Sequence, residues 1–164
     1  MSWLEQRKEL TEFAREIEPS VIILPKTHWV GKVLSALHVA VTFGKVSFEY
    51  TENRVATTLG PLQFYPEGYE ADDIKHVVVH ETQHTRQARA CGFWIPYVGP
   101  WLGLPIFFLL YVLLLFPVGL APFRFLFELD AEVKSWRYMR KTGITEHECR
   151  WRAEWFEKSV NGHK

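Results

Sequence analysis

The chain has few cysteines and no excess of charge of either sign. Cys91 and Cys149 are its two cysteines among 164 residues, and neither stands in a CxxC or Cys/His spacing. This pattern indicates two free thiols in a reducing compartment rather than a disulfide framework. Lys and Arg together number 19, as do Asp and Glu, and no block of basic residues is present. We therefore expect no binding of nucleic acid.

The sequence also lacks a secretory signal and a proline-free apolar run of bilayer length. Segment 1–19 is charged throughout and has no apolar core, so we expect residence in the cytoplasm and no secretion. From Ala90 to Phe123 there is no charged residue, but five prolines interrupt the segment. Its longest proline-free piece, 106–116, would span about 16 Å as a helix, roughly half of a bilayer core.

Local patterns predict one α+β domain over residues 1–164, with an apolar insertion at about 93–123. We expect helices over 2–18, in the centre of 28–44, over about 72–91 with Asp72 or Asp73 as its N-cap, over 122–142, and after a capping box at Thr145–Glu148. Short β-rich runs lie at 21–24, 45–50, 54–60 and 62–66. These runs predict a small antiparallel sheet that precedes the helix over 72–91.

The segment HVVVHETQHTRQ carries a histidine at every fourth position. On a helix, His76 and His84 lie about 40° to either side of His80, Gln87 lies between them, and Glu81 lies about 100° round. HETQH is an HExxH motif, in which two imidazoles one turn apart bind one Zn²⁺ and the glutamate reaches the water beside it. We expect His80 and His84 to be zinc ligands and Glu81 the general base. The alternative is a solvated helix face whose histidines only form hydrogen bonds.

A catalytic zinc site needs a third protein ligand and one open position. In FELDAEVKSW, Glu128 and Glu132 share a helix face, whereas Asp130 points about 200° away from Glu128. We expect Glu128 to be the third ligand, with Asp130 as its competitor. Glu132, one turn further on, is expected to accept the outer N–H of a ligating imidazole. Ordinary contacts of these acids with Arg124, Arg137 or solvent are the alternative.

The two motifs together resemble a known family. HETQH followed by ELDAE is similar to the HExxH…ExxxD arrangement of gluzincin metallopeptidases, including the membrane-associated CAAX-prenyl-protease and heat-shock protease group. The chain also resembles small uncharacterised phage and bacterial metallopeptidase-like proteins with an HExxHxxQ helix. The match covers about 76–92 and 124–143, and Glu132 stands where the family pattern has Asp. The resemblance implies a zincin-like fold, zinc as cofactor and an edge strand, here within 54–60, that pairs with the substrate backbone. The alternative for 54–60 is an ordinary core strand.

Four further residues are candidates for supporting roles. A peptidase needs a donor for the developing oxyanion, and Arg124, Tyr138 and His28 are candidates among which the sequence does not choose. His76 shares the face of His80, but a third ligand one turn further back would strain the tetrahedral angle at a single ion. We expect His76 either to support a zinc ligand without binding the metal itself or to cap the helix that carries His80 and His84.

These features predict a zinc-dependent peptidase acting on a peptide or protein substrate. The alternative is a zinc-containing structural or accessory component of a phage particle or membrane assembly, which would close the metal with four protein ligands. A third possibility is a membrane-bound scaffold that holds no metal.

The apolar insertion must be compatible with the proposed site. A single membrane crossing would put His80 and His84 on the opposite side from Glu128, and two crossings would need about 40 apolar residues. We therefore expect the arm at 93–123 to dock on a membrane interface or a partner protein. The chain would then be cytoplasmic, at a membrane surface, or within a larger assembly such as a virion.

Overall fold

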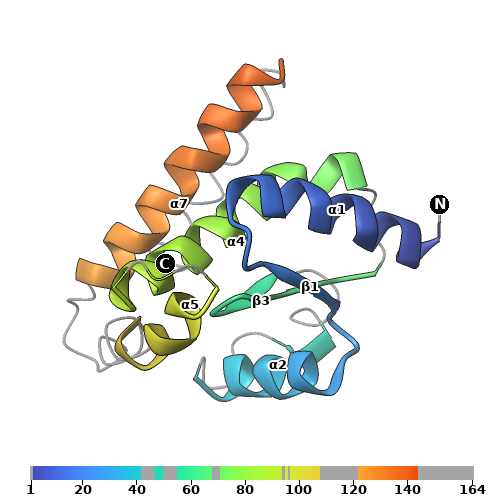
Figure 1. The fold of residues 1–164 in the computed structure, drawn as a ribbon. Coiled ribbons are helices and arrows are strands. Elements are labelled where there is room, and N and C mark those ends of the chain that lie inside the picture. Colours follow the sequence, from blue (N-terminus) through green and yellow to red (C-terminus); the bar gives the residue numbers. More distant parts are fainter. Residues whose placement is uncertain are drawn as a thin grey trace, which may run out of the picture.

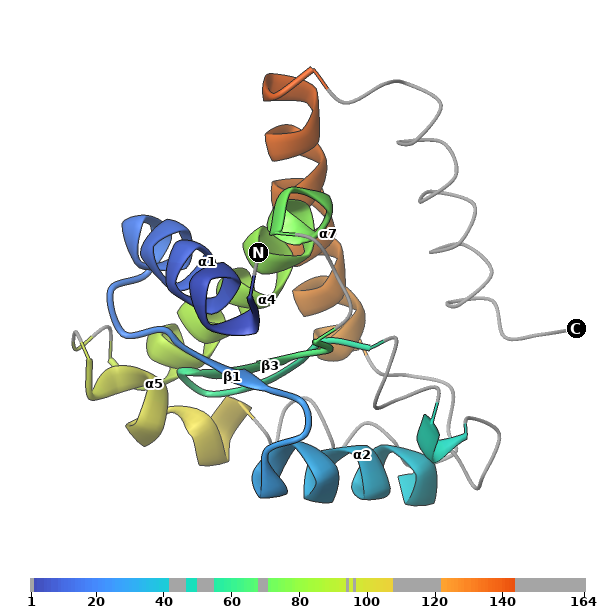
Figure 2. The same cartoon turned by 90° about the vertical axis from the view of Figure 1, so that its right-hand side faces the viewer.

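The computed structural model describes residues 2–41, 47–49, 55–67, 71–93, 95, 97–107 and 122–143. This part of the chain is α+β, mostly helical, with one three-stranded sheet. Figure 1 and Figure 2 show helices α1 and α4 on one face of the sheet and helix α2 on the other. The predicted capping box at Thr145–Glu148 and the helix predicted after it lie outside the described residues.

The N-terminal helix forms as its apolar spacing predicts. Helix α1 spans Trp3–Ile17 and begins with a capping box, in which the Glu5 N–H donates to Ser2 Oγ and the Ser2 N–H donates to the Glu5 carboxylate. Leu10 and Ala14 are fully buried in the main core. This core lies between α1, the sheet and α4, and comprises Leu10, Ala14, Val21, Ile23, Tyr65, Ile74 and Val78.

The sheet is mixed, so the prediction of an antiparallel sheet was wrong in one of its two pairings. Strands β1 (Ile22–Pro25), β3 (Leu62–Tyr65) and β2 (Thr57–Leu59) lie in that order, with β1 parallel to β3 and β2 antiparallel to it. The parallel pairing arises because the chain leaves β1 through helix α2 (Trp29–Val41) before it returns to the sheet. Residues 48–49 of the predicted 45–50 strand are helical, since a run of β-formers becomes a strand only where a neighbour pairs with it.

A two-residue turn fixes the register between β2 and β3. Gly60 has a φ of +60°, which favours glycine, and Pro61 follows it. Leu59 pairs with Leu62, and the pairing continues to Thr57 opposite Phe64. This hairpin confirms the predicted turn and places Thr58 opposite Gln63.

Helices α4 (Ala71–Cys91) and α7 (Pro122–Lys141) are the longest in the described chain and pack against each other. Both were predicted within two residues of their ends. Because α4 begins at Ala71, Asp72 and Asp73 lie in its first turn and not at the N-cap position. In Figure 1 and Figure 2, α7 crosses α4 and extends away from the sheet.

The apolar insertion begins by folding back on the end of α4. Helix α5 (Gly99–Leu102) packs on α4 so closely that a Cβ on Gly92 would collide with the main-chain oxygen of Gly99. A Cβ on Gly103 would collide with the main-chain oxygen of Ala88. Several large apolar side chains of this region are exposed, namely Phe93, Ile95, Tyr97, Val98, Trp101, Leu102 and Ile106. Within the described residues, no helix combines the length and apolar character needed to cross a bilayer.

Candidate metal centre

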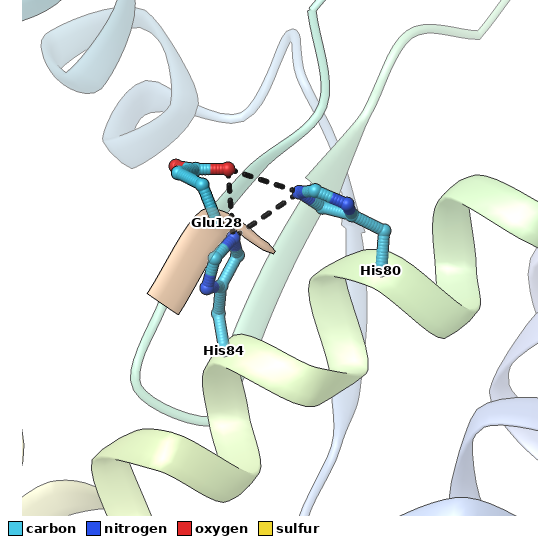
Figure 3. A group of neighbouring side chains, drawn as sticks. All are labelled: His80, His84 and Glu128. Atoms are coloured by element: carbon cyan, nitrogen blue, oxygen red, sulfur yellow. Dashed lines mark hydrogen bonds and ion pairs between the residues drawn. The ribbon is translucent and has the colours of Figure 1, made fainter. Parts of the chain in front are cut away.

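Three predicted ligands from two helices converge on one point. His80 and His84 project from α4 and Glu128 from α7, and one ligand atom from each lies within 4.8 Å of the others (Figure 3). The two Nε2 atoms are 3.2 Å apart, and Glu128 Oε2 lies 3.3 Å from His80 Nε2 and 3.6 Å from His84 Nε2. Ligand atoms about 2.05 Å from a tetrahedral zinc ion are about 3.3 Å apart. The donor set and its spacing therefore fit a zinc ion.

The His80 imidazole is oriented by a second carboxylate. Its Nδ1 lies 3.1 Å from Glu132 Oε2, and the other oxygen of Glu132 accepts a 2.8 Å hydrogen bond from the Trp136 indole. An ionised carboxylate only accepts, so the proton of this hydrogen bond belongs to Nδ1. The contact is the one predicted for Glu132, and it turns Nε2 toward Glu128.

The His84 imidazole is oriented by an amide. Its Nδ1 lies 2.9 Å from Gln87 Oε1, and Gln87 Nε2 donates to the Phe127 carbonyl oxygen at 3.0 Å and to Asp130 Oδ2 at 3.1 Å. Because both of these partners are acceptors, the amide presents its oxygen to the imidazole, and His84 Nδ1 must be the donor. Both histidines thus direct Nε2 toward the shared space.

The two candidate acids of α7 lie in different surroundings. Asp130 Oδ2 accepts hydrogen bonds from Gln83 Nε2 at 2.6 Å and from Gln87 Nε2 at 3.1 Å. Asp130 is not a member of the group that could hold a metal, whereas Glu128 is. Asp130 instead holds the amide that orients His84, a role that its sequence position did not indicate.

The electrostatics of the cluster favour a cation. Burial opposes a charged His80, but hydrogen bonds with Glu128 and Glu132 and the charge of Glu81 outweigh it and raise the pKa of His80 to about 10. Burial likewise opposes ionisation of Glu128, yet hydrogen bonds from the two imidazoles bring the pKa of Glu128 well below its usual value. A proton on His80 balances part of the negative charge, and a divalent ion would balance more of it.

The predicted general base lies beside the ligands, facing the sheet. The Glu81 side chain is 8% exposed, and its Oε2 accepts a 2.6 Å hydrogen bond from Thr58 Oγ1 on β2. The same hydroxyl lies 3.4 Å from the main-chain oxygen of Glu81. Sequence reasoning missed Thr58, and its only signal was its place in the predicted edge strand.

The four supporting candidates fall in different places. His76 is not in the metal-binding group, and its carbonyl oxygen accepts a hydrogen bond from Ser135 of α7. Tyr138 packs edge-on against Phe13 of α1, about 15 Å along α7 from Glu128, so the structure does not bring it to the ligand cluster. His28 packs against Trp29 and Phe64. Arg124 lies in the first turn of α7, and its side chain is outside what the structure describes.

The candidate ligand group has three members in the part of the chain that the structure describes. Among the described residues, no fourth His, Cys, Asp or Glu joins His80, His84 and Glu128. Three protein ligands and a free position are typical of catalytic zinc, whereas structural zinc is closed by four.

Comparison with known proteins adds no family to this geometry. No family model matches the chain, and neither a curated protein nor a solved structure matches it. The function is therefore inferred from the site alone.

Proposed function

We propose that the chain is a zinc-dependent peptidase of gluzincin type, with His80, His84 and Glu128 as zinc ligands and Glu81 as general base. The observation that carries this proposal is the convergence of two Nε2 atoms and one carboxylate oxygen at separations of 3.2, 3.3 and 3.6 Å. Both imidazoles are also held in the tautomer that zinc requires, by Glu132 and Gln87.

The chemistry follows from the groups around this point. A bound zinc ion would polarise the scissile carbonyl and lower the pKa of an adjacent water. Glu81 takes a proton from that water as the water oxygen attacks the carbonyl carbon. Glu81 then gives the proton to the amine as the C–N bond breaks. Glu132 and Gln87 keep the two imidazoles in place throughout the cycle.

The sheet offers a place for the substrate backbone. The outer side of β1 is covered, because Arg7 Nε donates to the Ile23 carbonyl at 2.7 Å and Arg15 Nε donates to the Val21 carbonyl at 3.1 Å. Strand β2 forms the other edge of the sheet and packs on α4 beside Glu81. A peptide added to β2 as a further strand would run past the general base.

The decisive test pairs zinc stoichiometry with cleavage of an unstructured protein. Purified wild type, Glu81→Gln and Glu128→Ala are compared, with Glu16→Ala, an exposed acid of α1, as the matched control. We expect one bound zinc ion per chain in wild type, Glu81→Gln and Glu16→Ala. Glu128→Ala should bind zinc more weakly and retain less of it after purification. Cleavage should fall about 10²–10⁴-fold in Glu81→Gln, because general bases contribute that much.

The outcomes separate the proposal from its alternatives. Zinc bound without cleavage by any variant would favour the structural or accessory role. A wild type that binds no zinc would contradict both the peptidase and the structural zinc site.

A further inference from the structure

Thr58 stands where the sheet edge meets the general base. In β3, the Pro61 and Tyr65 carbonyls accept hydrogen bonds from Ile22 and Lys26, so alternate residues of β3 face β1. The alternate residues Leu62 and Phe64 therefore face β2. Their main-chain groups bond to Leu59 and Thr57. Thr58 is opposite Gln63, so its own main-chain N–H and C=O point away from β3, toward the side of β2 on which no strand of the described chain pairs.

The side chain of Thr58 projects from the face of the sheet toward α4. Its hydroxyl donates to Glu81 Oε2 at 2.6 Å, which restricts the carboxylate and leaves Oε1 to receive a proton. Thr57, one residue earlier, lies on the opposite face, where its hydroxyl meets the Lys26 ammonium. The two threonines of β2 thus differ in what they contact, although they are adjacent in sequence.

The position of Thr58 relative to α4 is itself fixed by a neutral network. Gln63 Nε2 donates at 3.2 Å to the hydroxyls of both Thr82 and Thr85, and Gln63 Oε1 accepts from Tyr65 at 2.8 Å. Gln63 is the strand partner of Thr58 and is fully buried. Strand β2 therefore meets the ligand helix in one register, with Thr58 beside Glu81.

We propose that Thr58 is a positioning residue that couples substrate binding to the general base. This inference rests on the proposed peptidase function. The main chain of Thr58 pairs with the peptide substrate while its hydroxyl holds Glu81 in the orientation for proton transfer. Thr58 then sets both the register of the substrate and the orientation of the base. A peptide that pairs in the right register on β2 lies beside a Glu81 carboxylate that is oriented for proton transfer.

The test compares Thr58→Val, Thr58→Ser and Thr57→Val with wild type in cleavage of a peptide long enough to pair along β2. Valine keeps the β-branched shape and the main chain but removes the hydroxyl, so kcat should fall about 10- to 100-fold with KM unchanged, as for a misplaced catalytic group. Zinc content should stay at the wild-type value. Serine restores the hydroxyl and should recover most of kcat, and Thr57→Val should keep wild-type kcat in the folded fraction.

Each result bears on a different claim. If wild type cleaves and Thr58→Val matches its kcat, the positioning role is wrong while the peptidase stands. An equal fall in kcat for Thr58→Val and Thr57→Val, or no recovery with serine, would show a general perturbation of the strand and overturn the role of the hydroxyl. If wild type does not cleave, the failure is that of the proposed function.

Discussion

The two long sides of α4 use polar side chains in different ways. Toward α7, the helix presents imidazoles and amides to the three carboxylates Glu128, Asp130 and Glu132. Toward the sheet, it presents the hydroxyls of Thr82 and Thr85 to the neutral amide of Gln63. Glu81 lies between these two sides, about 100° round the helix from His80, and accepts a hydrogen bond from Thr58 of β2. The neutral side is satisfied by its own hydrogen bonds, whereas the charged side holds more negative than positive groups.

This difference indicates that the two sides of α4 contribute differently to stability and to cation binding. A buried neutral network that is fully hydrogen-bonded adds stability and specifies register. A buried group of like charges costs stability until a cation enters it. Substitutions on the two sides should therefore be separable, because the side toward α7 carries the proposed zinc ligands and the side toward the sheet carries the neutral network.

The largest separable effect is expected at Glu132. Replacing Glu132 with Ala removes the acceptor that holds His80 Nδ1, and such outer partners contribute about 10–100-fold to metal affinity. Zinc affinity, measured by competition with a chromogenic chelator, should fall by that factor. Glu132→Gln, whose side-chain oxygen can still accept, is the matched control and should lose less. Equal affinities in all three proteins would contradict the orienting role.

The second effect is a pH dependence that arises only on the charged side. In the metal-free chain the pKa of His80 is raised to about 10, so zinc must displace a proton at neutral pH. Zinc affinity should rise about tenfold per pH unit from about 6.5 to 8, because one proton competes. Titration calorimetry in two buffers would count the released proton. An affinity independent of pH would contradict the raised pKa.

The same ionisation predicts the opposite trend for stability without metal. A histidine whose pKa is raised in the folded state contributes its full stabilisation of the fold below the unfolded pKa of about 6.5. This contribution is lost as the pH rises toward the folded pKa of about 10. The metal-free chain should therefore become easier to unfold with urea across that window. Glu128→Gln, which removes one of the carboxylates, should show a shallower trend.

The smallest effect on zinc is expected from the neutral side. Replacing Gln63 with Leu leaves Tyr65, Thr82 and Thr85 without their amide partner, which should lower the free energy of unfolding by about 1–3 kcal/mol. Zinc affinity of the folded protein should stay within twofold of wild type. Urea unfolding and chelator competition on the same samples check both statements, and a large loss of zinc would break the separation.

The sequence predicts the parts of the site that depend on helical periodicity. His80, Glu81 and His84 lie on one helix, and Glu128 and Glu132 on another, so their relative directions follow from about 100° per residue. The same geometry separates Asp130 from Glu128, although it does not indicate that Asp130 would meet Gln83 and Gln87.

The parts that depend on how elements pack were less predictable. The contact between Thr58 and Glu81 joins a strand to a helix, and no local spacing encodes it. The parallel pairing of β1 with β3 likewise depends on the path of the chain through α2, while residues 48–49 of the predicted strand at 45–50 are helical against their local propensity.

The close contact between the end of α4 and α5 has a consequence for the order of folding. Gly92 and Gly103 bring together main-chain atoms within one short loop, whereas the contact of His80 with Glu132 joins residues 52 apart in sequence. Closing the longer loop costs more chain entropy, so the α4–α5 joint should form before α7 docks. The proposed zinc site would then be completed in a late folding step. The rate of zinc uptake by a refolding chain would therefore report the rate at which α7 docks.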